Sequence, residues 1–336
     1  MQYVLGIDQG GTKTNAVVAD TSGNILGLGS SGGGAHFVLG MAPAMALVRE
    51  AAEGALRQAG ITANEITLVC GGLSGADFEN EYELLRTNVV ETLGVPNVLI
   101  VNDCIIAMRA GLSKRAGAVI CAGTGLNVAV HNADGAEFIL GYYIDDRYQG
   151  AGALGKNALL AVFDAEAKLG PETMLTDKLL AHFNTPTVDA LLQEHIERRI
   201  GVDERKELTY TLAECAAAGD AVSADILRTF ALDCFGFFRA GMQKLGLSDC
   251  DLELVISGGV FKSRYPLMLD TLKQAVAETY PSVRLVEAAW EPVVGAALLA
   301  LDALNTGAEL DEGVYAAIQQ ACVQHGLIRQ TKGGAL

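Results

Sequence analysis

An internal repeat limits the folds open to this 336-residue chain. Residues 11–29, GTKTNAVVADTSGNILGLG, align without gaps on residues 123–141, GTGLNVAVHNADGAEFILG, and 7 of the 19 positions are identical. Both segments open with Gly-Thr, continue through apolar residues, and place a turn glycine at the same position (Gly23 and Gly135). Each therefore predicts a β-hairpin. Two unrelated hairpins of similar composition remain an alternative, but we favour a duplicated domain whose copies each open with one hairpin.

The first hairpin has the composition of an anion-binding turn. Residues 5–20 read LGIDQGGTKTNAVVAD, with an acid and two adjacent glycines between two apolar runs. A Walker A loop or a dinucleotide fingerprint would open a helix, whereas the run after the turn predicts a second strand. Glycines in such a turn leave backbone N–H groups open to an anion. We therefore predict that the two hairpins face one cleft and hold one polyphosphate from both sides.

Strands and helices alternate around the repeat, which predicts an α/β fold. Helices are expected at residues 43–60, 79–94, 266–280 and 293–304, and they dominate residues 155–245. Apolar runs predict strands at residues 3–8, 14–20, 24–29, 66–72, 97–103, 117–123, 125–132, 136–143, 252–259 and 283–288.

Charge and cysteine content exclude several classes of function. Acids outnumber bases 40 to 24, for a formal charge of −16, and this field repels nucleic acid and anionic membranes. A phosphate ligand must then be held locally, by backbone amides or a metal ion. The 7 cysteines form no CxxC pair, which is typical of buried thiols in a reducing compartment. No apolar run reaches about 18 residues and no signal segment precedes the first strand, so we expect a cytoplasmic protein.

Four motifs carry a family resemblance. They are Asp8 with Gly10-Gly11-Thr12, Asp103 in VNDCIIA, Gly123-Thr124-Gly125, and Gly258-Gly259 after LELVIS. Their order resembles that in the superfamily of sugar kinases, actin and the 70-kilodalton heat-shock chaperones. More narrowly, GIDQGGTKT, GLSGAD and ISGGVFKS resemble the N-acetylglucosamine and glucosamine kinase branch, which includes the BadF/BadG/BcrA/BcrD-type ATPases.

This resemblance implies a fold and a domain division. It implies two duplicated RNase-H-like domains of the actin-like ATPase type around a central cleft. We place the first domain at residues 1–113 and the second at residues 114–305, with a helical insertion at about 155–245. Residues 306–336 are then a helical tail that could pack on the N-terminal domain. We also expect a homodimer.

The resemblance further implies an ATP-dependent sugar kinase that uses Mg²⁺ and a small-molecule sugar acceptor. Asp103 would be the base that accepts the proton of the sugar hydroxyl, and Asp8 would hold Mg²⁺ through water. Ser74, Asp77, Asp103 and Asp146 would line the sugar side. The phosphates would be bound by Gly10, Gly11, Thr12, Lys13, Gly123, Thr124 and Gly125, and the adenosine by Gly258 and Gly259.

The residues alone leave structural alternatives open. Asp8 could cap a turn, Asp103 could be the N-cap of the following helix, and Lys13 could be a solvated turn residue. Ser74 and Asp77 could be ordinary loop residues. For the aromatic residues Phe37 and Trp290 we expect core packing rather than stacking on a sugar.

Two departures from the family pattern concern the acceptor. Ala35 stands where the family has asparagine in an Asn-His-Trp-like stretch, and the family's Gly-Asp-Glu-Gly-Ser motif is missing near Asp145, Asp146 and Arg147. Because these charges suit a polar or amino group better than a neutral acetamido group, we expect glucosamine or another polar sugar rather than N-acetylglucosamine.

Two other functions compete with the kinase. The first is an ATPase activator that energises a redox partner through an iron–sulfur cluster held by cysteines in loops. Cys70, Cys104 and Cys121 lie in apolar segments instead, which disfavours it. The second is a sugar sensor without catalysis. Sensors of this superfamily usually carry a DNA-binding helix-turn-helix, and we expect none ahead of the first strand.

Overall fold

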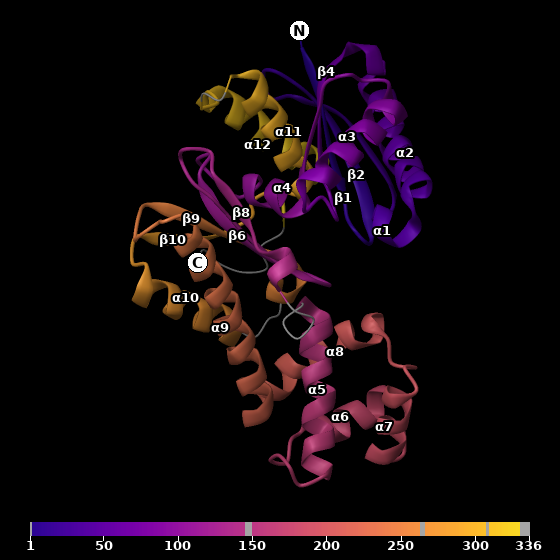
Figure 1. Ribbon diagram of the computed structural model, residues 1–336, viewed down its shortest axis with the longest axis vertical. Helices are drawn as coiled ribbons and strands as arrows, with labels where there is room; N and C mark the ends of the chain where they lie inside the picture. Colours follow the sequence, from indigo (N-terminus) through magenta and orange to yellow (C-terminus); the bar gives the residue numbers. More distant parts are fainter. Residues whose placement is uncertain (1, 145–149, 263–265, 307–308, 330–336) are drawn as a thin grey trace. The chain divides into compact units, whose positions relative to one another are not determined.

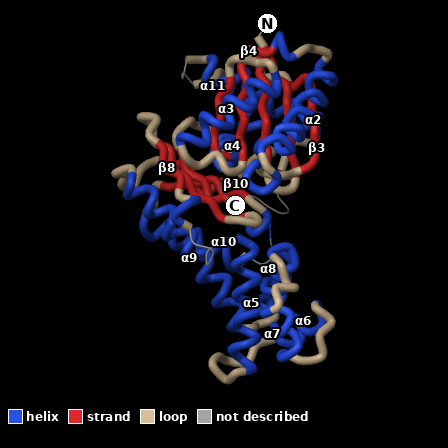
Figure 2. The backbone as a smooth tube through the Cα atoms, turned by 45° about the vertical axis from the view of Figure 1, so that its right-hand side comes forward, coloured by secondary structure: helices blue, strands red, loops and turns tan. Residues whose placement is uncertain are grey.

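The computed structural model describes residues 2–144, 150–262, 266–306 and 309–329, and the chain divides into two compact units (Figure 1). Unit 1 comprises Met1–Val119, His131–Gly135 and Val286–Leu336, and unit 2 comprises Ile120–Val130 and Ala136–Leu285. Figure 2 shows that each unit combines a sheet with helices. This is the predicted α/β class.

The two sheets have the same strand order. The strands of the first are β1 (Tyr3–Gln9), β2 (Lys13–Asp20), β3 (Ile25–Gly32), β4 (Ile66–Leu73) and β5 (Val98–Asn102), in the order β3-β2-β1-β4-β5. Those of the second are β6 (Gly117–Ala122), β7 (Leu126–His131), β8 (Glu137–Ile139), β9 (Leu252–Ser257) and β10 (Val283–Glu287), in the equivalent order β8-β7-β6-β9-β10. The turn glycines Gly23 and Gly135 have φ of 89° and 86°, a region open to glycine. The predicted duplication is confirmed.

The first sheet brings three strand ends to one edge. β1 pairs antiparallel with β2 and parallel with β4, and β4 pairs parallel with β5. Since β1, β4 and β5 run in one direction, their carboxyl ends lie at the same edge. In open α/β sheets that edge is where ligands bind.

Helices cover both faces of this sheet. One face packs against α2 (Met41–Ala59) and α3 (Glu79–Leu93), and the other against α4 (Asp103–Arg109), α11 (Pro292–Leu304) and α12 (Glu312–His325). A short α1 (His36–Leu39) precedes α2, and a 3₁₀ turn (Ala63–Glu65) precedes β4. Both faces are therefore apolar, as in other sheets buried on two sides.

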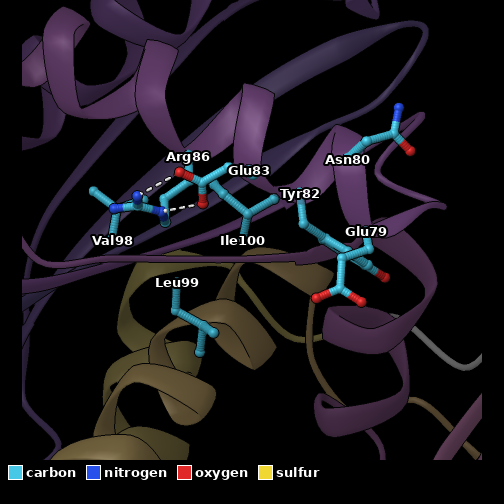
Figure 3. A pocket seen from close by; sticks show the side chains of 8 residues that line it. All are labelled: Glu79, Asn80, Tyr82, Glu83, Arg86, Val98, Leu99 and Ile100. Carbon is cyan, nitrogen blue, oxygen red and sulfur yellow. Dashed lines mark hydrogen bonds and ion pairs between the residues drawn. The ribbon is translucent and has the colours of Figure 1, made fainter.

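The edge strand β5 shows this alternation at the level of side chains. Val98 and Ile100 pack with the α2/α3 face, and Leu99 packs with the α11 face (Figure 3). A shallow hollow between β5 and α3 is lined by these three residues together with Glu79, Asn80, Tyr82, Glu83 and Arg86. None of the predicted site residues lines it.

Most helices described in unit 2 lie within residues 150–244, between β8 and β9. They are α5 (Gly150–Glu166), α6 (Leu175–His182), α7 (Val188–Ile196), α8 (Val202–Ala217), α9 (Ala221–Lys244) and α10 (Leu267–Thr279), with 3₁₀ turns at Gly141–Tyr143 and Gly259–Lys262. The long helices α5, α8 and α9 pack on one another, and α10 packs on α9 (Figure 1).

The structure divides the chain differently from the predicted boundaries. The sequence predicts that α11 is part of a second domain ending at residue 305, but α11 packs on β1, β4 and α4 and belongs to unit 1. The cause is its apolar sequence VVGAALLALDAL, which covers the sheet face left bare by α2 and α3. α12 also packs on unit 1. The strand predicted to Tyr143 ends at Ile139, because Tyr143 N–H bonds the carbonyl of Leu140 in a 3₁₀ turn.

A buried ion pair joins α4 to α11. Arg109 Nε donates to Asp302 Oδ2 at 2.7 Å and Arg109 Nη1 donates to the carbonyl of Leu112 at 3.2 Å. Arg109 Nη2 also donates to the hydroxyl of Tyr315 on α12. The side chains of Arg109 and Asp302 are 2% and 3% exposed. Removal of one partner would leave the other charge buried without its counter-ion.

We predict that Arg109→Met lowers the free energy of unfolding by about 3–5 kcal/mol, the usual cost of breaking a buried pair. The matched control is Arg86→Met, whose pair with Glu83 is exposed and should be worth about 0–1 kcal/mol. Urea unfolding followed by circular dichroism measures both. A loss below about 1 kcal/mol for Arg109→Met would contradict this account of the pair.

Candidate active site

The first glycine-rich hairpin turn is exposed. It joins β1 to β2 through Gly10, Gly11 and Thr12, and a Cβ atom added at Gly11 would meet nothing within 4 Å. Gly10 N–H bonds the carbonyl of Lys13 at 3.0 Å, and Gly34 N–H bonds the carbonyl of Gly10 at 3.0 Å. The backbone therefore fixes the turn while its outer side stays open to a ligand.

Asp8 lies at the base of this turn, on the central strand of the sheet. It is 9% exposed and stands opposite Asn15 of β2 and Gly72 of β4. Burial raises the pKa of Asp8 from 3.8 to about 7, and the charge of Asp103 raises it as well. The charge of Lys13 lowers the pKa of Asp8, and the charge of Glu291 raises it. Asp8 is thus a buried acid whose ionised form is disfavoured.

The loop after β4 brings Ser74 and Asp77 to the same edge. Ser74 N–H bonds the carbonyl of Gln9 at 3.0 Å, next to Asp8. Asn102 Nδ2 donates to Asp77 Oδ1 and, at 3.1 Å, to the carbonyl of Ala76. These bonds fix the loop between the ends of β1 and β5.

Asp103 follows β5 directly and is the first residue of α4. The N-cap of α4 is its neighbour, because Asn102 Oδ1 accepts from Cys104 N–H at 2.9 Å. The alternative reading, in which Asp103 is itself the N-cap, is therefore wrong. The sequence "VND" offers two capping residues in a row, and only the coordinates decide between them.

The surroundings of Asp103 shift its pKa toward neutrality. Burial contributes most, the charge of Asp77 adds to it, and together they raise the pKa from 3.8 to about 6. Hydrogen bonds from Cys104 N–H and from the hydroxyl of Ser74 act in the opposite direction. A carboxylate with a pKa near 6 is ionised at neutral pH and is basic enough to accept a proton.

The aromatic residue Phe37 is exposed, so the expectation of core packing is wrong for it. It is 65% exposed on the short helix α1, edge-on to His36 with ring centroids 5.7 Å apart. A Cβ atom added at Gly75 would lie 2.6 Å from Phe37 Cδ1, so α1 touches the loop of Ser74. Trp290, in contrast, packs partly buried against the core of the α11 face, as expected.

In unit 2, the two other glycine motifs are neighbours. The Gly123-Thr124-Gly125 turn joins β6 to β7 and follows Ala122 directly. Gly258, with φ of 103°, follows β9, and a Cβ atom there would lie 2.1 Å from the carbonyl oxygen of Ala122. Ala151 N–H of α5 bonds the carbonyl of Gly123 at 2.9 Å. The predicted substrate residue Asp146 lies outside the described residues.

Two charged residues escaped the sequence reasoning. Glu291 precedes α11, and its carboxylate lies 3.3 Å from Lys13 Nζ and 3.9 Å from Arg329 Nε. Lys13 is therefore held in an ion pair rather than solvated alone. The only local signal for Glu291 is its place before Pro292 at a helix start. Nothing in the sequence indicates that residues 13, 291 and 329 meet.

The fold and the comparisons with known proteins agree. Two units with one duplicated topology define a protein of the actin-like ATPase fold. Residues 5–300 match the BadF/BadG/BcrA/BcrD ATPase family, and the chain belongs to this family.

Two proteins that are similar to this chain in sequence are named as sugar kinases. An N-acetyl-D-glucosamine kinase of Dictyostelium discoideum is 30% identical over 314 residues, which cover 90% of this chain and 98% of the relative. A glucosamine kinase of Vibrio cholerae is 26% identical over 246 residues, covering 71% and 80%. A solved Chromobacterium violaceum structure, assigned as an N-acetylglucosamine kinase, is similar with a TM-score of 0.69 and 21% identity, covering 89% and 99%. At that identity it supports the fold alone.

We predict that Asp103→Asn lowers kcat by roughly two to four orders of magnitude, because the amide keeps the shape but cannot accept a proton. Nucleotide affinity should change little. Thr124→Val should act the other way and weaken nucleotide binding first. Steady-state rates and nucleotide titrations measure both effects, with the exposed Asp134→Asn as a control. Near-normal turnover of Asp103→Asn would leave Asp103 with a structural role.

The raised pKa of Asp103 predicts an acidic limit to catalysis. Below its pKa of about 6 the carboxyl is protonated and cannot act as a base, so kcat/KM should fall about tenfold per pH unit. A pH–rate profile between pH 5 and pH 8 checks this. A profile that stays flat down to about pH 5 would contradict the role of Asp103.

Proposed function

We propose that this protein is an ATP-dependent sugar kinase whose acceptor is an amino sugar. The carrying observation is the proximity of two acids in unit 1. Asp103, whose pKa is raised to about 6, is close enough to raise the pKa of Asp8, and Asp8 lies at the base of the open hairpin. A base beside a phosphate-binding turn is the arrangement that phosphoryl transfer to a hydroxyl requires.

The residues of the chain divide the work between binding and proton transfer. The backbone amides of Gly10, Gly11 and Thr12 and the ammonium of Lys13 bind the terminal phosphates of ATP. Asp103 accepts the proton of the attacking sugar hydroxyl, and Ser74 donates a hydrogen bond that orients the carboxylate. In unit 2, Gly123, Thr124 and Gly125 bind phosphate, and Gly258 and Gly259 allow the adenosine to approach the backbone.

Mg²⁺ fits this site through Asp8. Among the described residues, no three His, Cys, Asp or Glu side chains form a metal-binding group. Mg²⁺ in phosphoryl-transfer enzymes needs only one or two carboxylates, because phosphates and water supply its other ligands. Asp8 carries a raised pKa in an excess of negative charge, which a divalent cation would offset. When bound, the ion neutralises charge on the phosphates.

An amino sugar suits the charges on the acceptor side. Asp77 and Asp103 bring two carboxylates together there, and the exposed rings of Phe37 and Phe78 flank the loop of Ser74 and Asp77. Carboxylates favour a free amine over a neutral acetamido group, and aromatic rings bind the apolar face of a sugar. Ala35 is 2% exposed and offers no side-chain hydrogen bond to an acetamido group. We therefore propose an unacetylated amino sugar.

The burial of the cysteine residues disfavours the rival function, an ATPase activator. Cys70 and Cys104 are buried, at 0% and 2% exposure, and Cys121 is half-buried. Burial raises the pKa of Cys70, which disfavours the thiolate that a metal cluster requires. Cys70 and Cys104 are core residues of β4 and α4.

Two further proposals concern the cellular location of the protein and its oligomeric state. Within the described part of the chain, no helix has the length and apolar character to cross a membrane. We propose that the kinase acts in the cytoplasm, in line with its free thiols. Homodimer formation remains a prediction, which sedimentation equilibrium checks.

We predict that ADP release is faster with glucosamine than with N-acetylglucosamine. The physical reason is the pair of acceptor-side carboxylates, which an ammonium group satisfies and an acetamido group does not. A coupled ADP assay over amino sugars, acetylated sugars and polyols measures the preference, with buffer lacking sugar as control. A clear preference for N-acetylglucosamine would refute this acceptor assignment, and no release above control with any sugar would refute the kinase.

A further inference from the structure

Three charged residues from distant parts of the chain meet beside the first hairpin. The Glu291 carboxylate lies between two cations, with Oε2 3.3 Å from Lys13 Nζ and Oε1 3.9 Å from Arg329 Nε. Lys13 begins β2, Glu291 precedes α11, and Arg329 follows α12. Because each carboxylate oxygen faces a different cation, Glu291 brings the end of the described chain to the hairpin.

The backbone fixes the place of Arg329. α12 ends at Gly326, where Leu327 N–H bonds the carbonyl of Cys322 at 2.9 Å. The chain then runs antiparallel to residues 289–291, with Trp290 opposite Ile328. Glu291 N–H bonds the carbonyl of Leu327 at 2.9 Å, and Arg329 N–H bonds the carbonyl of Ala289 at 3.1 Å. The backbone of Arg329 is thus held opposite Ala289, two residues from Glu291, by this short antiparallel bridge.

Both cations also act on the buried acid at the base of the turn. The charges of Lys13 and Arg329 each lower the pKa of Asp8, so both cations lie near this residue at the base of the turn. The Arg329 side chain is 16% exposed, whereas the Lys13 side chain is 52% exposed. Arg329 is therefore the more shielded cation, and its charge is less screened by solvent.

The contact of Arg329 Nε with Glu291 Oε1 is long for an ion pair, at 3.9 Å. A guanidinium suits phosphate far better, because its planar fork gives two parallel hydrogen bonds to phosphate oxygens. The hairpin beside it is the turn assigned to the terminal phosphates of ATP.

We propose that Arg329 is a second phosphate-binding cation of the hairpin site, acting together with Lys13 on the terminal phosphates of a nucleotide. Glu291 holds the two cations beside the turn while nucleotide is absent, and the phosphates replace its carboxylate on binding. This inference rests on the proposed function, since it takes ATP as the ligand. It assigns a phosphate-binding role to a residue more than 300 positions from the hairpin.

The test compares nucleotide affinities in the full-length protein. ADP and AMP are titrated by calorimetry against the wild type, Arg329→Gln, Arg329→Lys and the exposed control Arg86→Gln. We expect Arg329→Gln to weaken ADP binding by about tenfold to a hundredfold, as for a lost charged hydrogen bond, and to leave AMP binding within about twofold. Arg329→Lys should recover part of the ADP affinity, and Arg86→Gln should change neither.

Three results would overturn the proposal. Unchanged ADP affinity in Arg329→Gln shows that Arg329 does not contact phosphate. Equal losses for ADP and AMP, with a lowered thermal midpoint, show a structural role. Absence of ADP binding in the wild type overturns the proposal together with the nucleotide site. If ADP binding shifts as expected but no sugar releases ADP, the phosphate site stands and the kinase proposal fails, so the two failures are distinguishable.

Discussion

The buried contact between Arg109 and Asp302 is the interaction on which the site depends. A guanidinium that is 2% exposed is tolerated only because Asp302, the carbonyl of Leu112 and the hydroxyl of Tyr315 surround it. Those partners belong to α4, α11 and α12, or lie next to them. The contact therefore fixes three helices against one face of the first sheet. Gly295 allows the tightest approach, since a Cβ atom there would lie 1.9 Å from the carbonyl oxygen of Ile106.

A charged residue of the candidate site lies at the start of one of these helices or directly beside each of the other two. Asp103 begins α4, Glu291 precedes α11, and Arg329 lies in the segment that follows α12. The sheet supplies the rest, because β1 and β4 end at the same edge with Asp8 and Ser74. The candidate site residues Asp103 and Glu291 thus lie at the starts of α4 and α11, and the opposite ends of these two helices are joined by the Arg109–Asp302 ion pair. Burial, with the charge of Asp103 second, raises the pKa of Asp8 to about 7.

Sequence reasoning identified what is local and missed what is distant. The hairpin, Asp8, Asp103 and the repeat of Gly11–Gly29 are visible because glycine spacing and apolar runs are written in adjacent residues. The place of α11 in unit 1 was not predictable, since an apolar helix can cover either sheet. The contacts of Glu291 with Lys13 and Arg329 join segments with no shared pattern, and only the folded chain brings them together. The exposure of Phe37 is not predictable, because an aromatic residue in isolation gives no indication of which side of a helix is buried.

Transfer of the γ-phosphoryl group to a sugar, rather than to water, is the claim that matters most. The direct measurement is mass spectrometry of glucosamine after incubation with ATP whose γ-phosphoryl oxygens carry a heavy isotope. The account predicts a sugar phosphate that contains the labelled phosphoryl oxygens, formed in equal amount with ADP and lost in Asp103→Asn. Labelled inorganic phosphate and ADP, without any phosphorylated sugar across the amino sugars, acetylated sugars and polyols tested, would show an ATPase and contradict the account.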